Sequence, residues 1–275
     1  MPPKPRVQLA LTSPLATHSW EFGRLALQVL YDADPRLHPE RVGLNDTDLR
    51  KKLPCDTVED VKPLWAVGAE DWGEQPESVA SDLHWRRAKP LQARGAFGHL
   101  GKTLKGNLLP AFVRLTCNYR PDVDLLQPFK AWCRLYKPTQ AYLHYVGAPE
   151  LEPDYSYTIT PEQIKSGYRS PEMVQKDAWS SFIRGTFGPL RRQKTLNLGW
   201  VNYFPKEFVQ NGMPEELEAI GVTVEPFAEG YILQLGPSLG DVKTDFRTFS
   251  ELRHQAKGVL GRERFVIEEE PLLTG

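Results

Sequence analysis

The chain has 275 residues, of which 40% are hydrophobic, 25% charged and 11% aromatic, and its formal net charge is −1. These values exclude a chain that is disordered throughout and a uniformly basic coat for nucleic acid. No apolar run approaches the ~18 residues of a membrane span. Residues 1–6 lack the apolar core of a signal peptide, so we expect a cytoplasmic protein.

Several segments alternate apolar and polar residues with a period of two, which predicts half-buried strands. The segments with this pattern are 7–12, 111–118, 141–145, 196–203, 231–235 and 265–267. Other segments carry apolar residues at helical spacing. These predicted helices are 22–30, 128–136, 171–182, 214–220 and 249–260.

Residue types at the ends of these helices agree with the assignment. Ser19 and Ser170 are expected to cap two helices at their N-termini. Gly221 and Gly261 are expected to end two others, because glycine commonly follows the last helical turn.

The order of elements defines the fold class that we expect. Strands and helices alternate, but the strands are not the long, wholly apolar runs that fill a buried parallel sheet. We therefore predict an α+β fold, with a mostly antiparallel sheet and helices packed on one face. No linker divides the chain, so we expect a single composite domain that spans residues 1–275. Two sub-halves, 1–150 and 151–275, remain an alternative.

The near-zero net charge conceals two adjacent segments of opposite charge. Residues 56–82, called here the acidic segment, carry a charge of −7, and residues 84–120, the basic segment, carry +8. Acidic residues around large aromatic side chains could dock a cationic partner, since charge steers the encounter and aromatics anchor it. The candidate partner-binding residues are Asp56, Glu59, Asp60, Trp65, Glu70, Asp71, Trp72, Glu74, Glu77 and Asp82.

Two other interpretations of these charges remain open. The two segments could neutralise each other within the fold, or each could form a solvated face. The basic segment could also bind nucleic acid, because aromatic residues available for base stacking are interleaved with the basic ones. These aromatic residues are Trp85, Phe97, Phe112 and Tyr119.

The basic segment also contains a glycine-rich stretch, residues 94–103. A phosphate-binding loop requires four residues between its first glycine and the final Gly-Lys pair. Here five residues separate Gly95 from Gly101, and Ala96 occupies the position of the required glycine. We therefore expect a flexible basic loop rather than a nucleotide site.

No residue pattern predicts an enzyme. The six histidines lack metal-ligand spacing, and no G-x-S-x-G nucleophile motif is present. Asp241 and Asp245 precede the last predicted helix and could act as an acid–base pair, but helix capping is the commoner role of such residues. The three cysteines, Cys55, Cys117 and Cys133, are expected to be inert and buried. We expect no catalytic residues, no cofactor and no metal.

A resemblance to a known family rests on the C-terminal half of the chain. Residues 196–204 read L-N-L-G-W-V-N-Y-F, a short helical stretch and Gly221 follow, and G-Y-I-L-Q-L-G begins at Gly230. This order of elements resembles that of bacterial polymorphic-toxin immunity proteins. It is most similar to immunity protein family 52, a class associated with type VI secretion. The G-W-x-N-Y-F strand carries most of the resemblance.

The resemblance implies a non-enzymatic, cytoplasmic antitoxin. Its partner would be a secreted effector, in this family often a restriction-endonuclease-like nuclease, and no catalytic residues are implied. Trp200, Asn202 and Tyr203 are expected to be structural, and an inward-facing Asn202 would need hydrogen-bond partners. Since a nuclease site attracts phosphate with Lys and Arg, the acidic segment could mimic the nucleic acid. The alternative is a nucleic-acid-binding module that uses the basic segment.

Overall fold

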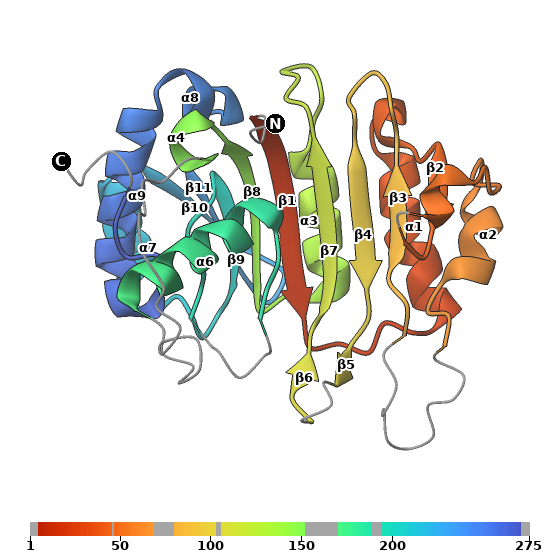
Figure 1. Cartoon of the computed structure of the whole chain (residues 1–275). Helices are drawn as coiled ribbons and strands as arrows, with labels where there is room; N and C mark the ends of the chain where they lie inside the picture. Colours follow the sequence, from red (N-terminus) through yellow and green to blue (C-terminus); the bar gives the residue numbers. More distant parts are fainter. Residues whose placement is uncertain are drawn as a thin grey trace.

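A nine-stranded antiparallel sheet forms the centre of the computed structural model (Figure 1). The structure describes residues 5–45, 47–68, 80–102, 106–151, 170–188 and 194–270. From one edge to the other the strands are β10 (Val222–Phe227), β11 (Gly230–Leu235), β9 (Val201–Pro205), β8 (Gln140–Val146), β1 (Arg6–Ser13), β7 (Ala111–Cys117), β4 (Arg94–Gly98), β3 (Leu83–Arg86) and β2 (Arg41–Gly43). A separate two-stranded ribbon pairs β5 (Gly101–Lys102) with β6 (Leu108–Leu109).

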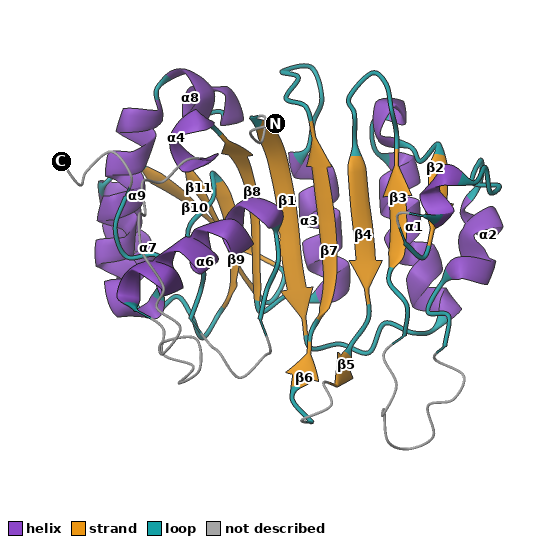
Figure 2. Ribbon diagram, in the orientation of Figure 1, coloured by secondary structure: helices purple, strands orange, loops and turns teal. Residues whose placement is uncertain are grey.

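Two helices, α1 (Trp20–Asp32) and α3 (Leu126–Tyr136), cover one face of this sheet (Figure 2). Ser19 caps α1 by accepting a hydrogen bond from the Phe22 amide, as its position predicts. The buried stripe of α3, including Phe129 and Trp132, packs in the main core with Val7 and other inward-facing residues of β1. The alternating pattern of β1 therefore identifies the core-facing side of the central strand.

A further helix, α6 (Pro171–Arg184), lies on the opposite face in front of β8 and β1 (Figure 2). Ser170 caps this helix, and Gly185 ends it in the left-handed conformation. Trp179 and Phe182 pack there against Ala10 and Tyr142 in a second, smaller core. The α+β class and the antiparallel sheet are confirmed. The helix predicted over 171–182 is α6, but the expectation that the helices pack on one face is wrong, because α6 buries Trp179 and Phe182 on the second face.

C-terminal helices pack beside the half of the sheet that contains β10. The helices here are α7 (Met213–Ala219), α8 (Leu239–Thr244) and α9 (Phe246–Leu260). Of these, α7 contacts β10, α9 contacts β11 and α8 contacts β8. Two short helices lie elsewhere, α2 (Val58–Val61) near α1 and α4 (Ala148–Leu151) directly after β8. Three-residue 3-10 turns occupy Pro35–Leu37, Asp48–Arg50, Lys62–Leu64 and Arg262–Arg264.

Three local predictions differ from the structure. The strand expected over 196–203 begins at Val201, and the one expected over 265–267 is an isolated bridge between Thr195 and Phe265. The loop expected over 94–103 contains strand β4. A Cβ at Gly98 would lie 2.1 Å from the Phe112 ring on the neighbouring strand, so this glycine permits close packing.

The structure also bears on membrane insertion and on the state of the cysteines. Within the described ranges, no helix is long and apolar enough to cross a membrane. All three cysteines are buried and unbridged, and burial raises the pKa of Cys117 to about 12. A thiol that stays protonated is a weak nucleophile, which agrees with the expected inert role.

Candidate functional site

The face of the sheet opposite α1 and α3 presents a cluster of arginines. On β2, β3 and β4, Arg41 pairs directly with Arg86, and Arg86 with Arg94. Directly paired residues project to the same face, so these three form a row across strands spaced about 4.8 Å apart. Next to it, Arg114 of β7 is opposite Ala96 of β4 and Ala10 of β1.

Two more arginines join this row from the other side. Arg6, at the start of β1, donates a hydrogen bond to the Ile183 carbonyl of α6 at 3.0 Å. Arg184, the last residue of α6, is exposed and close enough to Arg6 for the two charges to repel. We call this group the arginine face; its members are Arg6, Arg41, Arg86, Arg94, Arg114 and Arg184.

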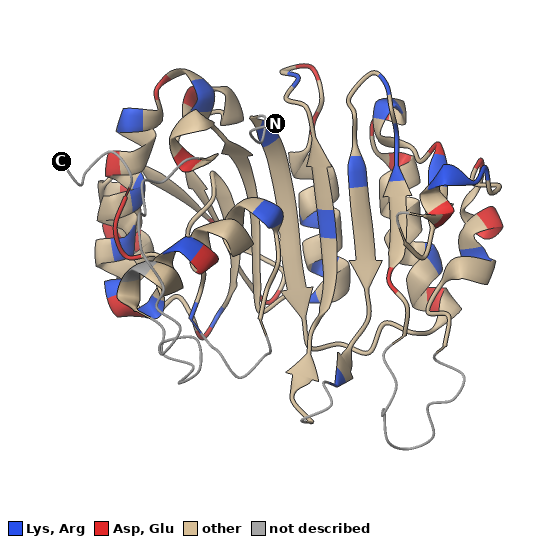
Figure 3. Ribbon diagram, in the orientation of Figure 1, with Lys and Arg blue, Asp and Glu red and all other residues tan. Residues whose placement is uncertain are grey.

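Few interactions among the described residues balance this positive charge. In the described part of the molecule, the side chains of Arg86, Arg94 and Arg41 form no ion pair or hydrogen bond. The strands β1, β2, β3, β4 and β7 contain no acidic residue at all. Figure 3 shows blue positions on these neighbouring strands. The nearby acid is Asp82, directly before the first residue of β3, which attracts Arg114.

The pKa values of two of these arginines are lowered, by burial and in part by the neighbouring positive charges. Burial is the main reason that the pKa of Arg6 is lowered, and Arg94 and Arg184 lower it further. Burial also lowers the pKa of Arg114, which Asp82 opposes and Arg94 reinforces. Both side chains remain charged at neutral pH, because the arginine pKa starts far above it. The repulsion between these charges therefore destabilises the folded chain at neutral pH, and a bound anion would reduce it.

Helix coverage of this face is incomplete. In Figure 1, α6 crosses in front of β8 and β1, and β7, β4 and β3 carry no described helix on that side. The reverse side of the same strands is the main core, where Leu83, Trp85 and Phe97 are almost fully buried. One half of the sheet thus has an apolar face that the core covers and a cationic face on which the structure describes no helix.

The basic segment is divided between this face and other places. Arg86, Arg94 and Arg114 lie on the arginine face. Arg87 bonds the His38 carbonyl and lies 3.8 Å from Glu40, and Arg120 lies 3.5 Å from Asp122. Lys89 is exposed, Lys102 belongs to β5, and Lys105 lies outside the described residues.

The aromatic residues expected to stack on bases are not free to do so. Trp85 and Phe97 point into the main core. The guanidinium of Arg114 lies 4.5 Å above the Phe112 ring, and Tyr119 packs edge-on against Tyr145. The described basic segment therefore offers no exposed aromatic platform for nucleic-acid bases.

The acidic segment is only partly described. Asp56 and Glu59 are exposed around the N-terminus of α2, where the half-exposed Asp60 forms a capping box with Thr57. Asp82 is half-buried at the arginine face, and burial raises its pKa against the opposing effects of His84 and Arg114. The predicted binding residues Glu70, Asp71, Trp72, Glu74 and Glu77 lie outside the described residues.

Trp65 of the same segment belongs to the core. Its side chain is 7% exposed, and its indole nitrogen donates to the Thr17 carbonyl at 3.0 Å. The ring packs on Phe97 and edge-on against His99. A Cβ at Gly23 would lie 2.5 Å from the indole, so α1 passes closely over it. In this fold Trp65 is a packing residue, not a surface anchor.

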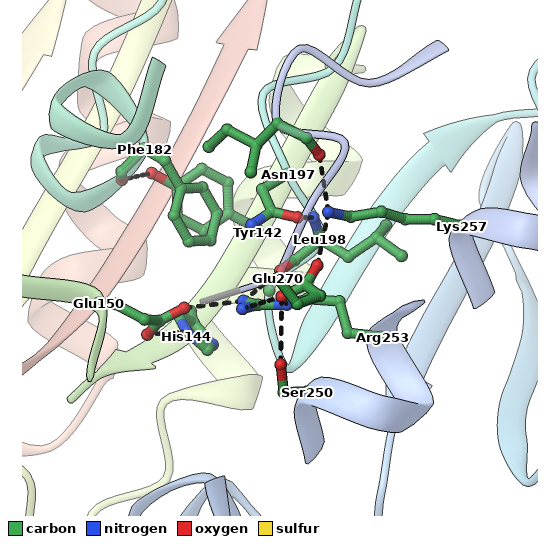
Figure 4. A network of polar contacts seen from close by, with 12 residues as sticks. Tyr142, His144, Glu150, Phe182, Asn197, Leu198, Ser250, Arg253, Lys257 and Glu270 are labelled. Atoms are coloured by element: carbon green, nitrogen blue, oxygen red, sulfur yellow. Dashed lines mark hydrogen bonds and ion pairs between the residues drawn. The ribbon is translucent and has the colours of Figure 1, made fainter. Parts of the chain in front are cut away.

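A second polar constellation is completely buried beside α9 (Figure 4). Arg253 of α9 contacts Glu150 of α4 at 2.8 Å and Glu270, near the end of the described chain, at 2.5 Å. Glu270 also forms an ion pair with Lys257 of α9 at 2.5 Å, and Glu150 pairs with His144 of β8 at 2.7 Å. We call these five residues the buried ion cluster.

The charges of the buried ion cluster stabilise one another. Burial would raise the pKa of Glu150, but His144 and Arg253 outweigh it and lower the pKa to about 2. Burial lowers the pKa of Lys257 to about 8 in spite of the attraction of Glu270. All five side chains are 0% exposed. Since no substrate could reach them in this conformation, the cluster fits a structural role better than a catalytic one.

The residues that carry the family resemblance are structural, as predicted. Asn202 is 1% exposed, and its side chain exchanges two hydrogen bonds with the Gly199 backbone, at 2.7 and 3.0 Å. Trp200 donates to the Gly236 carbonyl, and Tyr203 is 2% exposed. These side chains therefore stabilise the turn at Gly199 and pack in the core instead of contacting solvent.

The other candidate groups have ordinary structural roles. Asp241 forms a capping box with Ser238 at α8, and Asp245 caps α9 through the Thr248 amide. His99 is buried against Thr17, and His84 lies on β3 at the opposite face of the sheet. Among the residues that the structure describes, no group of three or more His, Cys, Asp or Glu could hold a metal ion.

Comparison with solved structures finds a protein of similar fold. The solved structure of the Pseudomonas aeruginosa T6SS protein PA0821 matches with a TM-score of 0.50 and 13% identity, covering 93% of this chain and 72% of that one. The fold is shared with a T6SS protein. At this identity the likeness establishes the fold alone. No family model and no curated protein sequence matches the chain, so membership of immunity protein family 52 remains a prediction.

Proposed function

We propose that this chain is an immunity-type protein that binds and neutralises a type VI secreted effector by direct protein–protein contact. The observation that carries the proposal is the arginine face, a broad surface of clustered charge that the described part of the chain leaves largely unbalanced. Clustered charge of one sign promotes fast and selective association with a complementary partner. A binding role explains such a surface better than a fold-stabilising role does.

Two further features support the link to type VI secretion. The fold is similar to that of a protein described as a T6SS protein. The order of elements from 196 to 236 resembles that of immunity protein family 52. The finer parts of the proposal follow from this resemblance: a cytoplasmic, non-enzymatic antitoxin, and an effector of the restriction-endonuclease-like nuclease class.

The geometry changes the choice of contact surface from the acidic segment to the arginine face. The exposed acids of the described acidic segment are accounted for by the start of α2, where negative side chains stabilise a helix N-terminus. Trp65 is buried. The described geometry therefore supports a cationic binding surface more directly than an acidic one. Partner binding by the remaining acidic-segment residues stays a prediction.

Effector neutralisation tests the proposal directly. The tagged protein is used to isolate proteins from its native host while type VI secretion is active, and the enriched effector is then produced in a sensitive bacterial strain. Co-production of this chain should restore growth, and the purified proteins should form a stoichiometric complex. Continued growth arrest without complex formation, for every effector recovered, would contradict the proposal. A complex with nucleic acid alone would favour the alternative of a nucleic-acid-binding module.

A further inference from the structure

We propose that the arginine face is the docking surface for an acidic protein surface, so that carboxylates of the partner pair with its guanidinium groups. The identity of that partner rests on the proposed function, whereas the location of the surface and the chemistry of its occupant rest on the fold. The occupant is a protein surface rich in Asp and Glu.

The geometry of the row favours recognition of several carboxylates at once. Arg41, Arg86 and Arg94 stand on three successive strands at directly paired positions. The strand spacing of about 4.8 Å holds their backbone positions at fixed separations. A planar guanidinium binds a carboxylate through two parallel hydrogen bonds, which gives direction as well as attraction. A rigid sheet carrying such groups is therefore a preorganised surface for clustered carboxylates.

The same arginines are available to a partner. Arg86, Arg94 and Arg184 are exposed, and Arg41 and Arg114 are half-exposed. The described helices leave β7, β4 and β3 uncovered on this side (Figure 1). Contacts within the described fold involve Arg6, which donates to the Ile183 carbonyl, and Arg114, which stacks on Phe112 and is attracted by Asp82.

Acidic protein is a better match than nucleic acid for two reasons. Single-stranded nucleic acid gains much of its binding from aromatic stacking, but Trp85 and Phe97 are in the core and Phe112 is covered by Arg114. The chain also has a net charge of −1, which gives no long-range attraction for a polyanion. Short-range pairing with localised carboxylates does not depend on a positive net charge.

Charge reversal on this face, measured with a defined anionic probe, tests the proposal. The probe is a fluorescent peptide of about 20 alternating Glu and Ser residues, titrated at about 50 mM NaCl, where screening is moderate. The variant R86E/R94E removes two exposed arginines that have no ion pair or hydrogen bond in the described chain. The control R24E/K52E makes the same change in net charge at exposed positions of α1 and a loop.

We expect the wild type and R24E/K52E to bind the peptide with affinities within about threefold of each other. R86E/R94E should bind at least about tenfold more weakly. Equal binding by R86E/R94E and R24E/K52E, or no binding by the wild type, would overturn the proposal. Circular dichroism and thermal melting establish that each variant is folded; should R86E/R94E be unfolded, R86Q/R94Q is measured with R24Q/K52Q as its control.

A parallel titration separates the two classes of anion. Single-stranded and duplex DNA of about 20 nucleotides are titrated under the same conditions. Tighter binding of either DNA than of the peptide, with the same dependence on Arg86 and Arg94, would overturn the proposal in favour of nucleic acid. The peptide titration contains no effector, so its failure leaves the neutralisation test intact, and failure of neutralisation leaves the peptide result intact.

Discussion

The carboxylate of Glu270 lies 2.5 Å from the guanidinium of Arg253, and both side chains are fully buried. Seventeen positions separate them along the chain, and the contact ties the end of the described chain to α9. The bond from Lys257 to the Ile267 carbonyl, at 2.7 Å, reinforces the same attachment. Ile267 and Glu270 are thereby part of the folded core.

Removal of the charge on Glu270 should strongly destabilise the protein. E270Q removes the carboxylate that Arg253 and Lys257 share and leaves both cations buried. Breaking a buried ion pair in this way lowers the free energy of unfolding by about 3–5 kcal/mol. Urea unfolding followed by circular dichroism measures the loss. E269Q, at the exposed neighbouring position, should change the free energy of unfolding by less than about 0.5 kcal/mol. Equal effects of the two substitutions would contradict a structural role for the buried ion cluster.

Glu150 should make stability depend on acid pH. Its pKa falls from the ordinary 4.5 to about 2 on folding, so the unfolded chain binds the proton more readily. The resulting stabilisation is complete above the unfolded pKa and is lost as pH falls toward 2. The shift corresponds to about 3 kcal/mol. The stability difference between wild type and E150Q should therefore shrink between about pH 6 and about pH 3 in urea unfolding; a constant difference would rule out this linkage.

Much of the fold could be predicted from local patterns. The alternation in β7 and β11 and the helical spacing in α1, α3, α6 and α9 are strong because each of these elements has one face that is more buried than the other. The strands β1 and β8 also alternate apolar and polar residues, although both of their faces are buried. The pattern failed in two segments. Residues 196–200 are almost wholly buried yet form an irregular segment, held by hydrogen bonds to Asn202. The sequence did not predict β4, because its two glycines, Gly95 and Gly98, suggested a loop. In the structure these glycines allow close packing between neighbouring strands.

Substitution of Trp65 should affect folding. W65A removes an indole that packs on Phe97 and His99 and donates to the Thr17 carbonyl, and a buried tryptophan truncated to alanine costs about 3–5 kcal/mol. W65F keeps part of the packing and should lose less. Thermal and urea unfolding measure both losses. A partner-binding defect in W65A with unchanged stability would instead support the surface-anchor role predicted from the sequence.

Charge crowding on the arginine face predicts a salt effect on stability. Arg94 repels Arg6 and Arg114, and dissolved salt screens repulsion between partly exposed charges. The melting temperature of the wild type should therefore rise more between about 20 and about 300 mM NaCl than that of R94Q. R24Q, on α1, should respond as the wild type does. An equal salt response in R94Q would show that Arg94 is not under repulsive strain.

The arginine face could be predicted only in part. The charge count detects the basic segment, and Arg86, Arg94 and Arg114 belong to it. Arg6, Arg41 and Arg184 come from distant parts of the chain; strand pairing places Arg6 and Arg41 on this surface, and the position of α6 brings Arg184 beside Arg6. The buried ion cluster left a weaker signal, the i, i+4 spacing of Arg253 and Lys257 on an apolar helix. Its acidic members lie over a hundred residues apart in sequence.

The most direct test of the central claim is growth rescue by the charge-reversal variants. The effector recovered with the wild-type chain is produced together with wild type, R86E/R94E or R24E/K52E, all at matched cellular levels. If the chain neutralises its partner through the arginine face, wild type and R24E/K52E restore growth and R86E/R94E does not. Rescue by R86E/R94E as complete as that by the wild type would contradict the account.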